Sequence, residues 1–504
     1  MNGASLVTPE HRSHSADWSV LSALRNPKRL RIEVLAGLVT ALALIPEALS
    51  FSILAGVDPQ VGLFAAFTMA VTIAITGGRR AMISGAAGST ALVVAPVVRD
   101  HGMNYLIATV LLAGVFQIVL SAAGVTKLMR FIPRSVMVGF VNALAILIFS
   151  AQLPHLIGVP WLVYPMVAVG LLIIVFLPKL TTVVPSPLVA IIVLTAVAVG
   201  FGLRLPTVGD EGALPASLPS LFFPHVPFTL DTLAIIAPYA LAMALVGLLE
   251  SLMTANLVDD ITDTPSNKSR EAWGQGVANI VTGLFGGIGG CAMIGQTMVN
   301  VKIAGARTRI STFLTGVFLL VLVVALSDLV ARIPMAALAA VMIMVSVTTF
   351  DWHSIAPKTL RRMPIAETTV MVVTVVVTVA TSDLAIGVIV GVLTAMVAFA
   401  HRVAHFTEVT PIGDERGTRV YKVRGELFFA SSNDLVTQFD YAGDPDRVVI
   451  DMSDTHIWDA STVAALDAIT HKYRTKGKHV EIVGLDPASQ QRHDRLSGHL
   501  TGAP

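Results

Sequence analysis

The sequence predicts an α-helical membrane protein with many spans, followed by a small soluble α/β domain. Its mean hydropathy is +0.75, and 13% of its residues are charged, whereas soluble proteins carry roughly 25%. Stretches without Asp, Glu, Lys or Arg, such as 102–126 and 272–301, are long enough for a span of about 20 residues. The composition changes abruptly near Thr407, which places the soluble domain at 407–504.

Fourteen apolar segments are predicted within 33–402. The third and tenth are short and rich in Gly, so we expect half-helices inside the protein rather than full spans. With the N-terminal segment 1–32 in the cytoplasm, the inner segments hold 20 Lys and Arg and the outer ones 3, as expected when positive charge stays inside. Both termini are therefore expected in the cytoplasm. The segments are 34–54, 61–77, 84–98, 103–124, 135–154, 161–178, 183–203, 232–255, 273–288, 292–304, 310–330, 335–350, 366–381 and 384–401.

An internal repeat connects the two halves of this region. Isolated carboxylates, runs of small residues and Ile-Pro pairs each recur at an offset of 201 to 203 residues. Such a duplicated bundle is typical of secondary transporters with a site at the membrane midplane. We expect repeat 1 at about 33–205 and repeat 2 at about 232–402. The matched features are Glu47 with Glu250, Gly85–Gly88 with Gly287–Gly290, and Ile132–Pro133 with Ile333–Pro334.

The soluble region alternates strand and helix patterns. The stretches VYKV, RVVIDM and HVEIVGL suit strands, and such alternation with helices predicts a small βα sheet. The helices are expected at 460–473, with Asp459 as the N-cap, and at 487–500.

Several stretches resemble one family of transporters. Gly37–Phe67 looks like the first-span signature of the sulfate-permease (SulP) family, and Gly247–Ser311 is similar to its eighth-to-tenth-span region. Ile450–Asp454 and Trp458–Thr462 resemble a STAS domain, the cytoplasmic module of that family. The resemblance implies a seven-plus-seven inverted repeat in which a core domain (spans 1–4 and 8–11) moves against a gate domain (spans 5–7 and 12–14).

The two short segments supply the candidate anion site. An anion inside a membrane needs positive potential, which the free N–H groups and positive dipole end of a half-helix provide. Small residues let a ligand approach those N–H groups closely, although they also let helices pack tightly in membranes. The predicted substrate-binding residues are Ala86, Ala87, Gly88 and Ser89 on the third segment, and Gly290, Cys291, Ala292 and Met293 on the tenth.

Isolated carboxylates mark the candidate coupling group. Glu250 stands alone in an apolar stretch, where a charge costs at least ~2.5 kcal/mol and usually marks an ion or proton pathway. Thr254, one turn further, could share a ligand or cation with it. Resemblance implies that this eighth-span position carries the family's coupling ion or proton. Glu47 occupies the equivalent position in the first repeat and follows Pro46. It could relay protons or cap the main chain, and the sequence leaves both roles open.

Other polar residues receive structural interpretations. Interhelical hydrogen bonding is expected for Gln275, Gln296 and Asn300, apolar pocket walls for Phe51 and Met293, and solvated loop charge for Asp259, Asp260 and Asp263. In the tail, the Asp-Ser pair of phosphorylated STAS proteins is interrupted as Asp459-Ala460-Ser461. Ser461 or Thr462 could substitute, but the interruption favours a regulatory or trafficking module without chemistry.

These features favour a secondary active transporter of a small anion, such as sulfate, bicarbonate or a dicarboxylate like fumarate, in the inner (plasma) membrane. Proton-coupled symport is preferred to sodium coupling because Glu residues in apolar surroundings suit protons and offer few oxygens for sodium. Sodium symport, anion exchange, a nucleobase permease and an anion channel are the alternatives. The sequence has no enzymatic motif, metal cluster or cofactor motif, so we expect no enzymatic activity, bound metal or cofactor. A homodimer without nucleic-acid partners is expected.

Overall fold

A computed structural model describes residues 19–127, 132–181, 185–215, 217–404, 407–415 and 417–499. The chain forms two compact units, Met1–Gly391 and Val392–Pro504, which we call the membrane unit and the carboxyl-terminal unit. The first eighteen residues of the predicted N-terminal segment and the last five residues of the chain lie outside the described part.

A helix occupies each of the predicted apolar segments. Seven helices in the described chain are long and apolar enough to cross a membrane, and the total of fourteen crossings stays a prediction. The helices are α2 (Pro27–Ala55), α3 (Pro59–Thr76), α4 (Gly88–His101), α5 (Met103–Ala122), α6 (Arg134–Ser150), α7 (Val163–Leu180), α8 (Ser186–Gly200), α9 (Leu230–Thr262), α10 (Lys268–Leu284), α11 (Ile294–Met298), α12 (Arg309–Ala325), α14 (Met335–Thr349), α16 (Ile365–Thr381) and α17 (Leu384–Ala404). Shorter helices are α1 (Val20–Arg25), α13 (Ser327–Ala331) and α15 (Pro357–Leu360).

Local chemistry explains where these helices begin and end. The Asn26 side chain accepts hydrogen bonds from the first N–H groups of α2, and Pro27 occupies the first position, where no N–H donor is needed. Gly56 ends α2 with φ of 76°, a left-handed conformation that glycine adopts without strain. The Thr229 and Thr308 hydroxyls cap α9 and α12 in the same way as Asn26 caps α2.

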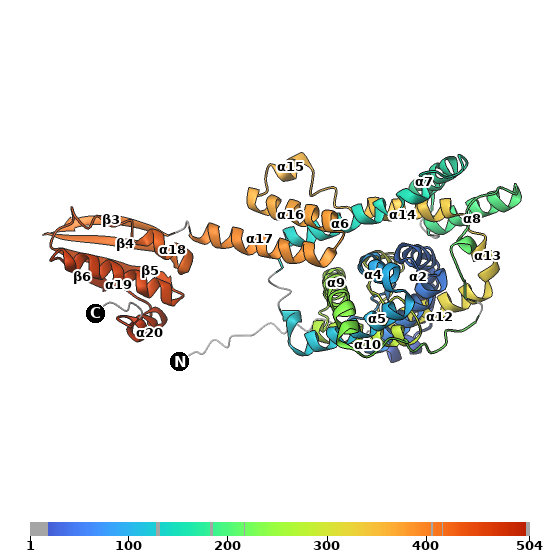
Figure 1. The fold of residues 1–504 in the computed structure, drawn as a ribbon, viewed down its shortest axis with the longest axis horizontal. Helices are drawn as coiled ribbons and strands as arrows, with labels where there is room; N and C mark the ends of the chain where they lie inside the picture. The colour runs from blue at the N-terminus through green and yellow to red at the C-terminus, as the bar shows by residue number, and fades with distance from the viewer. Residues whose placement is uncertain are drawn as a thin grey trace, which may run out of the picture. The chain divides into compact units, whose positions relative to one another are not determined.

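The helices of the membrane unit pack as two groups (Figure 1). In the first helix group, α2 packs on α3 and α12, and α5 packs on α9 and α10. In the second helix group, α6 packs on α14 and α16, and α7 packs on α8 and α14. Glycines allow the closest approach between α5 and α10: a Cβ on Gly114 would lie 2.6 Å from the Gly276 carbonyl oxygen, and a Cβ on Gly276 would lie 2.7 Å from that of Gly114. Small residues therefore set the helix spacing here.

The carboxyl-terminal unit contains a four-stranded sheet in the order β3-β4-β5-β6 (Figure 1). β3 (Glu408–Glu415) pairs antiparallel with β4 (Thr418–Leu427), whereas β5 (Arg447–Ile457) pairs parallel with β4 and with β6 (His479–Val483). Helices α18 (Phe429–Leu435), α19 (Ala460–Thr475) and α20 (Pro487–Leu496) connect or follow the strands. Asp459 caps α19 by accepting from the Thr462 N–H at 3.1 Å, as predicted.

A buried carboxylate lies in the core of this unit. Asp444 accepts hydrogen bonds from the phenol of Tyr421 at 2.9 Å and from that of Tyr473 at 2.6 Å. Burial, followed by the bond to Asp444, raises the pKa of each of these two phenols, so both remain protonated donors. The carboxylate is thereby compensated by two neutral hydroxyl groups and by the Arg419 guanidinium, whose Nε lies 3.7 Å from its Oδ1.

Replacing Tyr473 with Phe should lower the stability of the carboxyl-terminal unit by about 1–3 kcal/mol, because Asp444 stays buried with one donor fewer. Tyr441→Phe is the matched control, since that hydroxyl donates only to the main-chain oxygen of Val436. Hydrogen exchange of β4–β6 in the full-length protein measures both effects. Equal losses in the two variants would contradict the role given to Asp444.

Candidate functional site

Two short strands bring the third and tenth predicted segments together. β1 (Ser84–Gly85) pairs antiparallel with β2 (Cys291–Ala292), with Ser84 opposite Ala292 and Gly85 opposite Cys291. β1 leads into α4, whose N-cap is Ala87, and β2 leads into α11, whose N-cap is Met293. Neither N-terminus carries a side-chain cap. All the predicted substrate-binding residues therefore lie on or next to this strand pair.

The two helices that follow the strands are unequal. α4 is a regular helix of 14 residues, whereas α11 has 5 residues and continues as a π-helical turn over Val299–Ile303. π-helical turns frequently occur at functional sites. The repeat seen in the sequence therefore relates two helices of different regularity.

Glu250 on α9 lies against this strand pair. Its Oε2 atom accepts a hydrogen bond from the Ser89 hydroxyl, in the first turn of α4, and another from the Cys291 thiol of β2, with a sulfur–oxygen distance of 3.2 Å. Ser89 and Cys291 are completely buried, and Glu250 is 8% exposed. One carboxylate oxygen thus connects the third predicted segment, through Ser89, with the tenth, through Cys291; we call these two the broken segments.

Polar side chains behind β2 hold it in place. The Ser251 hydroxyl accepts from the Ala292 N–H at 3.0 Å. The Asn279 amide makes bonds of 2.8 and 3.0 Å to the N–H and carbonyl of Gly290, and it also donates to Gln117. These contacts fix the main chain beside the Cys291 thiol, so the thiol is oriented by three helices, α5, α9 and α10.

The other two predicted coupling residues do not touch the Glu250 carboxylate through a hydrogen bond in the described structure. The Thr254 hydroxyl donates to the main-chain oxygen of Glu250 at 2.7 Å, within its own helix. Glu47 is half-buried and accepts from the Gln296 amide at 2.7 Å. Gln296 thereby has the interhelical role expected from the sequence, between α11 and α2.

Apolar side chains close tightly around the start of α4. A Cβ on Gly88 would lie 2.9 Å from Cε1 of Phe51 in α2 and 3.1 Å from Cδ1 of Ile148 in α6. On the strand side, a Cβ on Gly85 would lie 3.3 Å from the Met293 sulfur. Phe51 and Met293 thus pack close to the two glycines, Ile148 brings the second helix group against the start of α4, and their role as pocket walls stays a prediction.

Two fully or nearly buried carboxylates were missed by the sequence analysis. Glu271 accepts from the N–H groups of Gly78 and Arg79 at 2.7 and 2.9 Å, and the Gln275 amide links it to Ser84 of β1. Glu33 caps the turn before α12 by accepting from three main-chain N–H groups. Both lie at segment ends rich in Lys and Arg, where the sequence gives no sign of burial.

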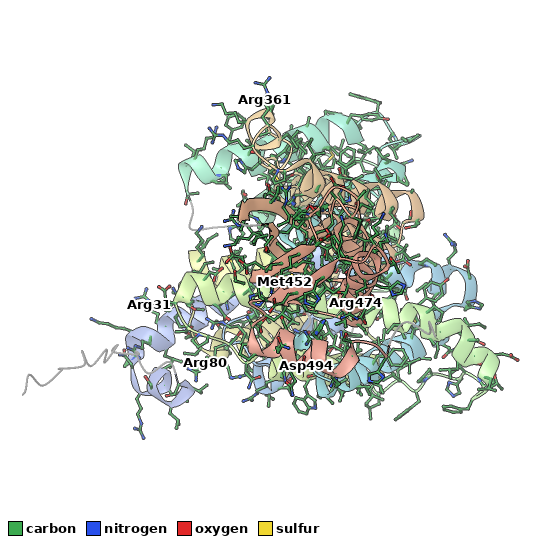
Figure 2. All side chains as sticks on the ribbon, turned by 90° about the vertical axis from the view of Figure 1, so that its left-hand side faces the viewer. Arg31, Arg80, Arg361, Met452, Arg474 and Asp494 are labelled. Carbon is green, nitrogen blue, oxygen red and sulfur yellow. The ribbon has the colours of Figure 1, made fainter. Side chains whose placement is uncertain are left out.

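The interpretation of Asp259 as solvated charge is wrong. Its carboxylate lies 3.0 Å from the Arg79 guanidinium and 2.7 Å from the Lys268 ammonium, and its side chain is 19% exposed. Arg79 is itself buried, in contrast to its exposed neighbour Arg80, which is labelled with Arg31 in Figure 2. The ion pair fastens the turn before β1 to the end of α9.

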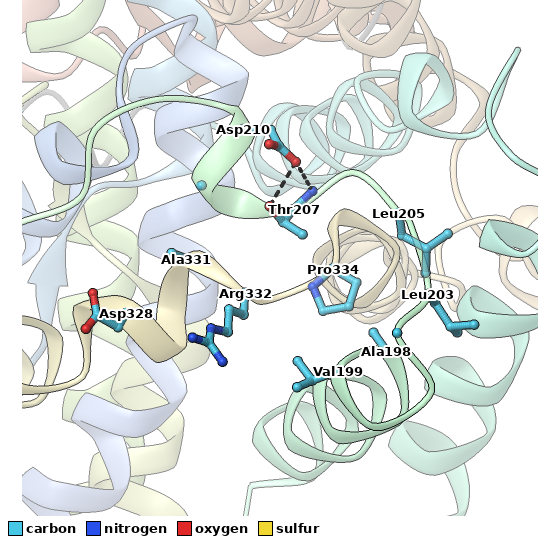
Figure 3. A pocket seen from close by; sticks show the side chains of 12 residues that line it. Ala198, Val199, Leu203, Leu205, Thr207, Asp210, Asp328, Ala331, Arg332 and Pro334 are labelled. Carbon is cyan, nitrogen blue, oxygen red and sulfur yellow. Dashed lines mark hydrogen bonds between the residues drawn. The ribbon is translucent and has the colours of Figure 1, made fainter.

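A cavity of ≈ 730 Å³ lies elsewhere in the membrane unit. It is lined by the end of α8, the stretch that follows it and the turn between α13 and α14 (Figure 3). Its charged lining residues are Asp210, Asp328 and Arg332, and the Asp210 carboxylate is held by Thr207. None of the predicted substrate-binding residues lines this cavity.

Comparisons with known proteins agree with this architecture. Residues 30–163 and 159–374 match the sulfate permease family, and residues 412–498 match the STAS domain. The chain is 54% identical to the putative sulfate transporter YbaR of Bacillus subtilis over 461 residues, which are 92% of this chain and 96% of that protein.

Solved structures show the same fold. The transmembrane domain of a cyanobacterial bicarbonate transporter, BicA, is 25% identical and matches with a TM-score of 0.60 over 73% of this chain and 98% of that one. The murine anion transporter Slc26a9 matches with a TM-score of 0.78 at 16% identity, over 92% of this chain and 87% of that one. The chain therefore belongs to the sulfate permease family of membrane-embedded anion transporters and carries a C-terminal STAS domain.

Proposed function

We propose that this protein is a secondary active transporter that moves a small oxyanion together with a proton. The observation that carries the proposal is the Glu250 carboxylate, which accepts hydrogen bonds from Ser89 and Cys291 where the two broken segments meet. A titratable group at that point can change its charge in step with occupancy by an anion. Isolated carboxylates within a membrane protein are usually part of an ion or proton pathway.

Proton coupling fits this geometry better than sodium coupling. Sodium needs several oxygen ligands, whereas the Glu250 carboxylate faces one hydroxyl oxygen and one sulfur in the described structure. The two side chains that contact the carboxylate are a hydroxyl and a thiol that donate hydrogen to it. Glu47, the second proposed coupling residue, is bonded to Gln296 of α11, a helix that packs against α9, and would pass protons toward Glu250.

The proposed substrate class rests on the hydrogen-bond donors at the start of α4 and on the substrates named for similar proteins. Uncapped N–H groups at the start of α4, with Ala87, Gly88 and Ser89 around them, suit an oxyanion without a fixed cation. The similar proteins are named as a putative sulfate transporter and a bicarbonate transporter. We propose sulfate or bicarbonate as substrates, with small dicarboxylates such as fumarate next.

We further propose the topology that this activity needs. Fourteen segments within 33–402 would form two inverted repeats in the inner membrane, with both termini cytoplasmic and the STAS domain at 407–504 as a regulatory module. The first helix group would act as the core domain and the second as the gate domain. The contacts of α14 with α2, and of α6 with α4, are the surfaces across which they would move. A homodimer would hold the gate domains still.

Uptake into proteoliposomes tests the proposal. Labelled sulfate, bicarbonate and fumarate are offered with a pH gradient alone, a sodium gradient alone, or an unlabelled anion in the lumen. We expect accumulation of at least one anion above equilibrium with the pH gradient only. Accumulation driven by the sodium gradient would replace proton symport with sodium symport. Uptake that always requires an anion in the lumen would replace it with anion exchange.

A further inference from the structure

We propose that the Glu250 carboxylate is itself a tethered occupant of the anion site, which a substrate anion must displace from Ser89 and Cys291. This inference rests on the proposed function and specifies how coupling arises there: carboxylate and substrate use the same donors, so they exclude each other. Protonation of Glu250 is then required for the anion to bind, and the proton does not occupy a separate site of its own.

The count of donors supports exclusion. A Ser hydroxyl and a Cys thiol each carry one hydrogen to donate. Both groups contact the same atom, Oε2 of Glu250, as donors, and they also lie 3.7 Å from each other. Both donors are fully buried, so they have no solvent alternative. In the described state neither side chain has a hydrogen left for a substrate.

The start of α4, which contacts the carboxylate through Ser89, is tightly packed. A Cβ on Gly88 would lie 2.9 Å from Phe51 and 3.1 Å from Ile148, and Ser89, the next residue, is completely buried. In this proposal a substrate anion that reaches the start of α4 takes the position of the carboxylate oxygen instead of adding to it.

Electrostatics explain why protonation would release the Glu250 side chain from Ser89 and Cys291. An anion beside an ionised Glu250 would place two negative charges at one pair of donors, which is costly where water is excluded. Protonation removes that charge and converts the carboxyl into a donor, so Glu250 can turn from accepting these bonds to donating one to the anion.

The remaining titratable groups near Glu250 are few. α4, α5, α10, α11 and β2 pack against α9. Cys291 of β2 is in direct contact, and Glu47 on α2 is bonded to Gln296 of α11. Glu271 on α10 is directed to the turn before β1 instead. Glu47 is therefore the group whose titration must be separated experimentally from that of Glu250.

Equilibrium binding to the purified full-length protein tests the exclusion. If one proton must bind before one anion, anion affinity falls by about tenfold for each unit of pH above the carboxyl pKa. Labelled sulfate, bicarbonate and fumarate are the probes. We expect this dependence in the wild type and in the control Glu367→Gln, which alters the exposed first turn of α16. We expect affinity that is independent of pH in Glu250→Gln, since a neutral amide needs no proton. Wild-type pH dependence in Glu250→Gln, its loss in Glu367→Gln, or no binding of any probe at acidic pH would overturn the proposal.

A spectroscopic measurement on the wild type avoids any folding defect of the variants. The chain has one cysteine, so its S–H stretching band in the infrared reports the acceptor of the Cys291 thiol alone. We expect the band to shift when a bound probe replaces the carboxylate. A bound anion that leaves the band unchanged would overturn the exclusion.

The two proposals fail in different ways. If Glu250→Gln loses gradient-driven uptake but keeps the wild-type dependence of binding on pH, coupling at Glu250 stands and displacement is wrong. If Glu250→Gln still accumulates anion in response to a pH gradient, Glu250 is not the coupling group. If the wild type accumulates no anion in response to a pH gradient, the proposed function is itself wrong.

Discussion

Glu250→Gln should abolish concentrative uptake, so that the luminal anion reaches only its equilibrium level whatever the pH gradient. The variant preserves the size of the side chain, and its amide oxygen can still accept from Ser89 and Cys291, but it cannot carry a proton. Anion exchange between two loaded compartments should persist because it needs no net proton movement. Uptake of labelled anion by proteoliposomes with and without a pH gradient measures both activities.

The matched control is Glu367→Gln, which removes a carboxylate from the exposed first turn of α16. Its accumulation ratio should equal that of the wild type. Undiminished accumulation by Glu250→Gln, or equal losses in the two variants, would remove Glu250 from the coupling step.

Gly290→Ala should weaken anion binding by about 10–100-fold, the equivalent of about 1–3 kcal/mol of overpacking. A Cβ at this position would lie 1.9 Å from the carbonyl oxygen of Gly85 and 2.6 Å from its carbonyl carbon. Main-chain atoms cannot rotate away as a side chain can, so β1 and β2 must separate. The Cys291 thiol and the start of α4 would then move apart, and an anion could no longer contact both.

Gly295→Ala is the matched control for this substitution, because a Cβ at Gly295 meets nothing within 4 Å. It adds the same methyl group five residues further along the same segment. We expect wild-type affinity in Gly295→Ala. Normal affinity in Gly290→Ala would show that the strand pair does not form the site.

Much of the fold could be predicted from the sequence because bilayer thickness and apolar composition constrain it strongly. Long apolar segments such as 103–124 have one low-energy structure in a membrane, a helix. Gly-rich runs at 85–88 and 287–290 marked the two places where helices break. The sequence could not show that α11 ends after five residues in a π-helical turn, because Val299–Ile303 has no Pro or Gly to mark the change.

The site was predictable where a residue was out of place in its surroundings. Glu250 is such a residue, since a lone carboxylate in an apolar helix calls for a partner. The partners themselves depend on tertiary contacts: nothing in the sequence directs the Ser89 hydroxyl and the Cys291 thiol to one oxygen atom. Glu271 and Glu33 were missed because main-chain N–H groups, which leave no trace in sequence, compensate them. Asp259 was misjudged because its partner Arg79 lies 180 residues earlier.

The most direct test of the account is the luminal pH of proteoliposomes during anion uptake. A pH-sensitive dye is enclosed in the vesicles, no gradient is imposed, and the transported anion is added outside. We predict that the lumen acidifies as anion enters, and that Glu250→Gln eliminates this acidification. Anion uptake by the wild type without any change in luminal pH would contradict proton coupling through Glu250.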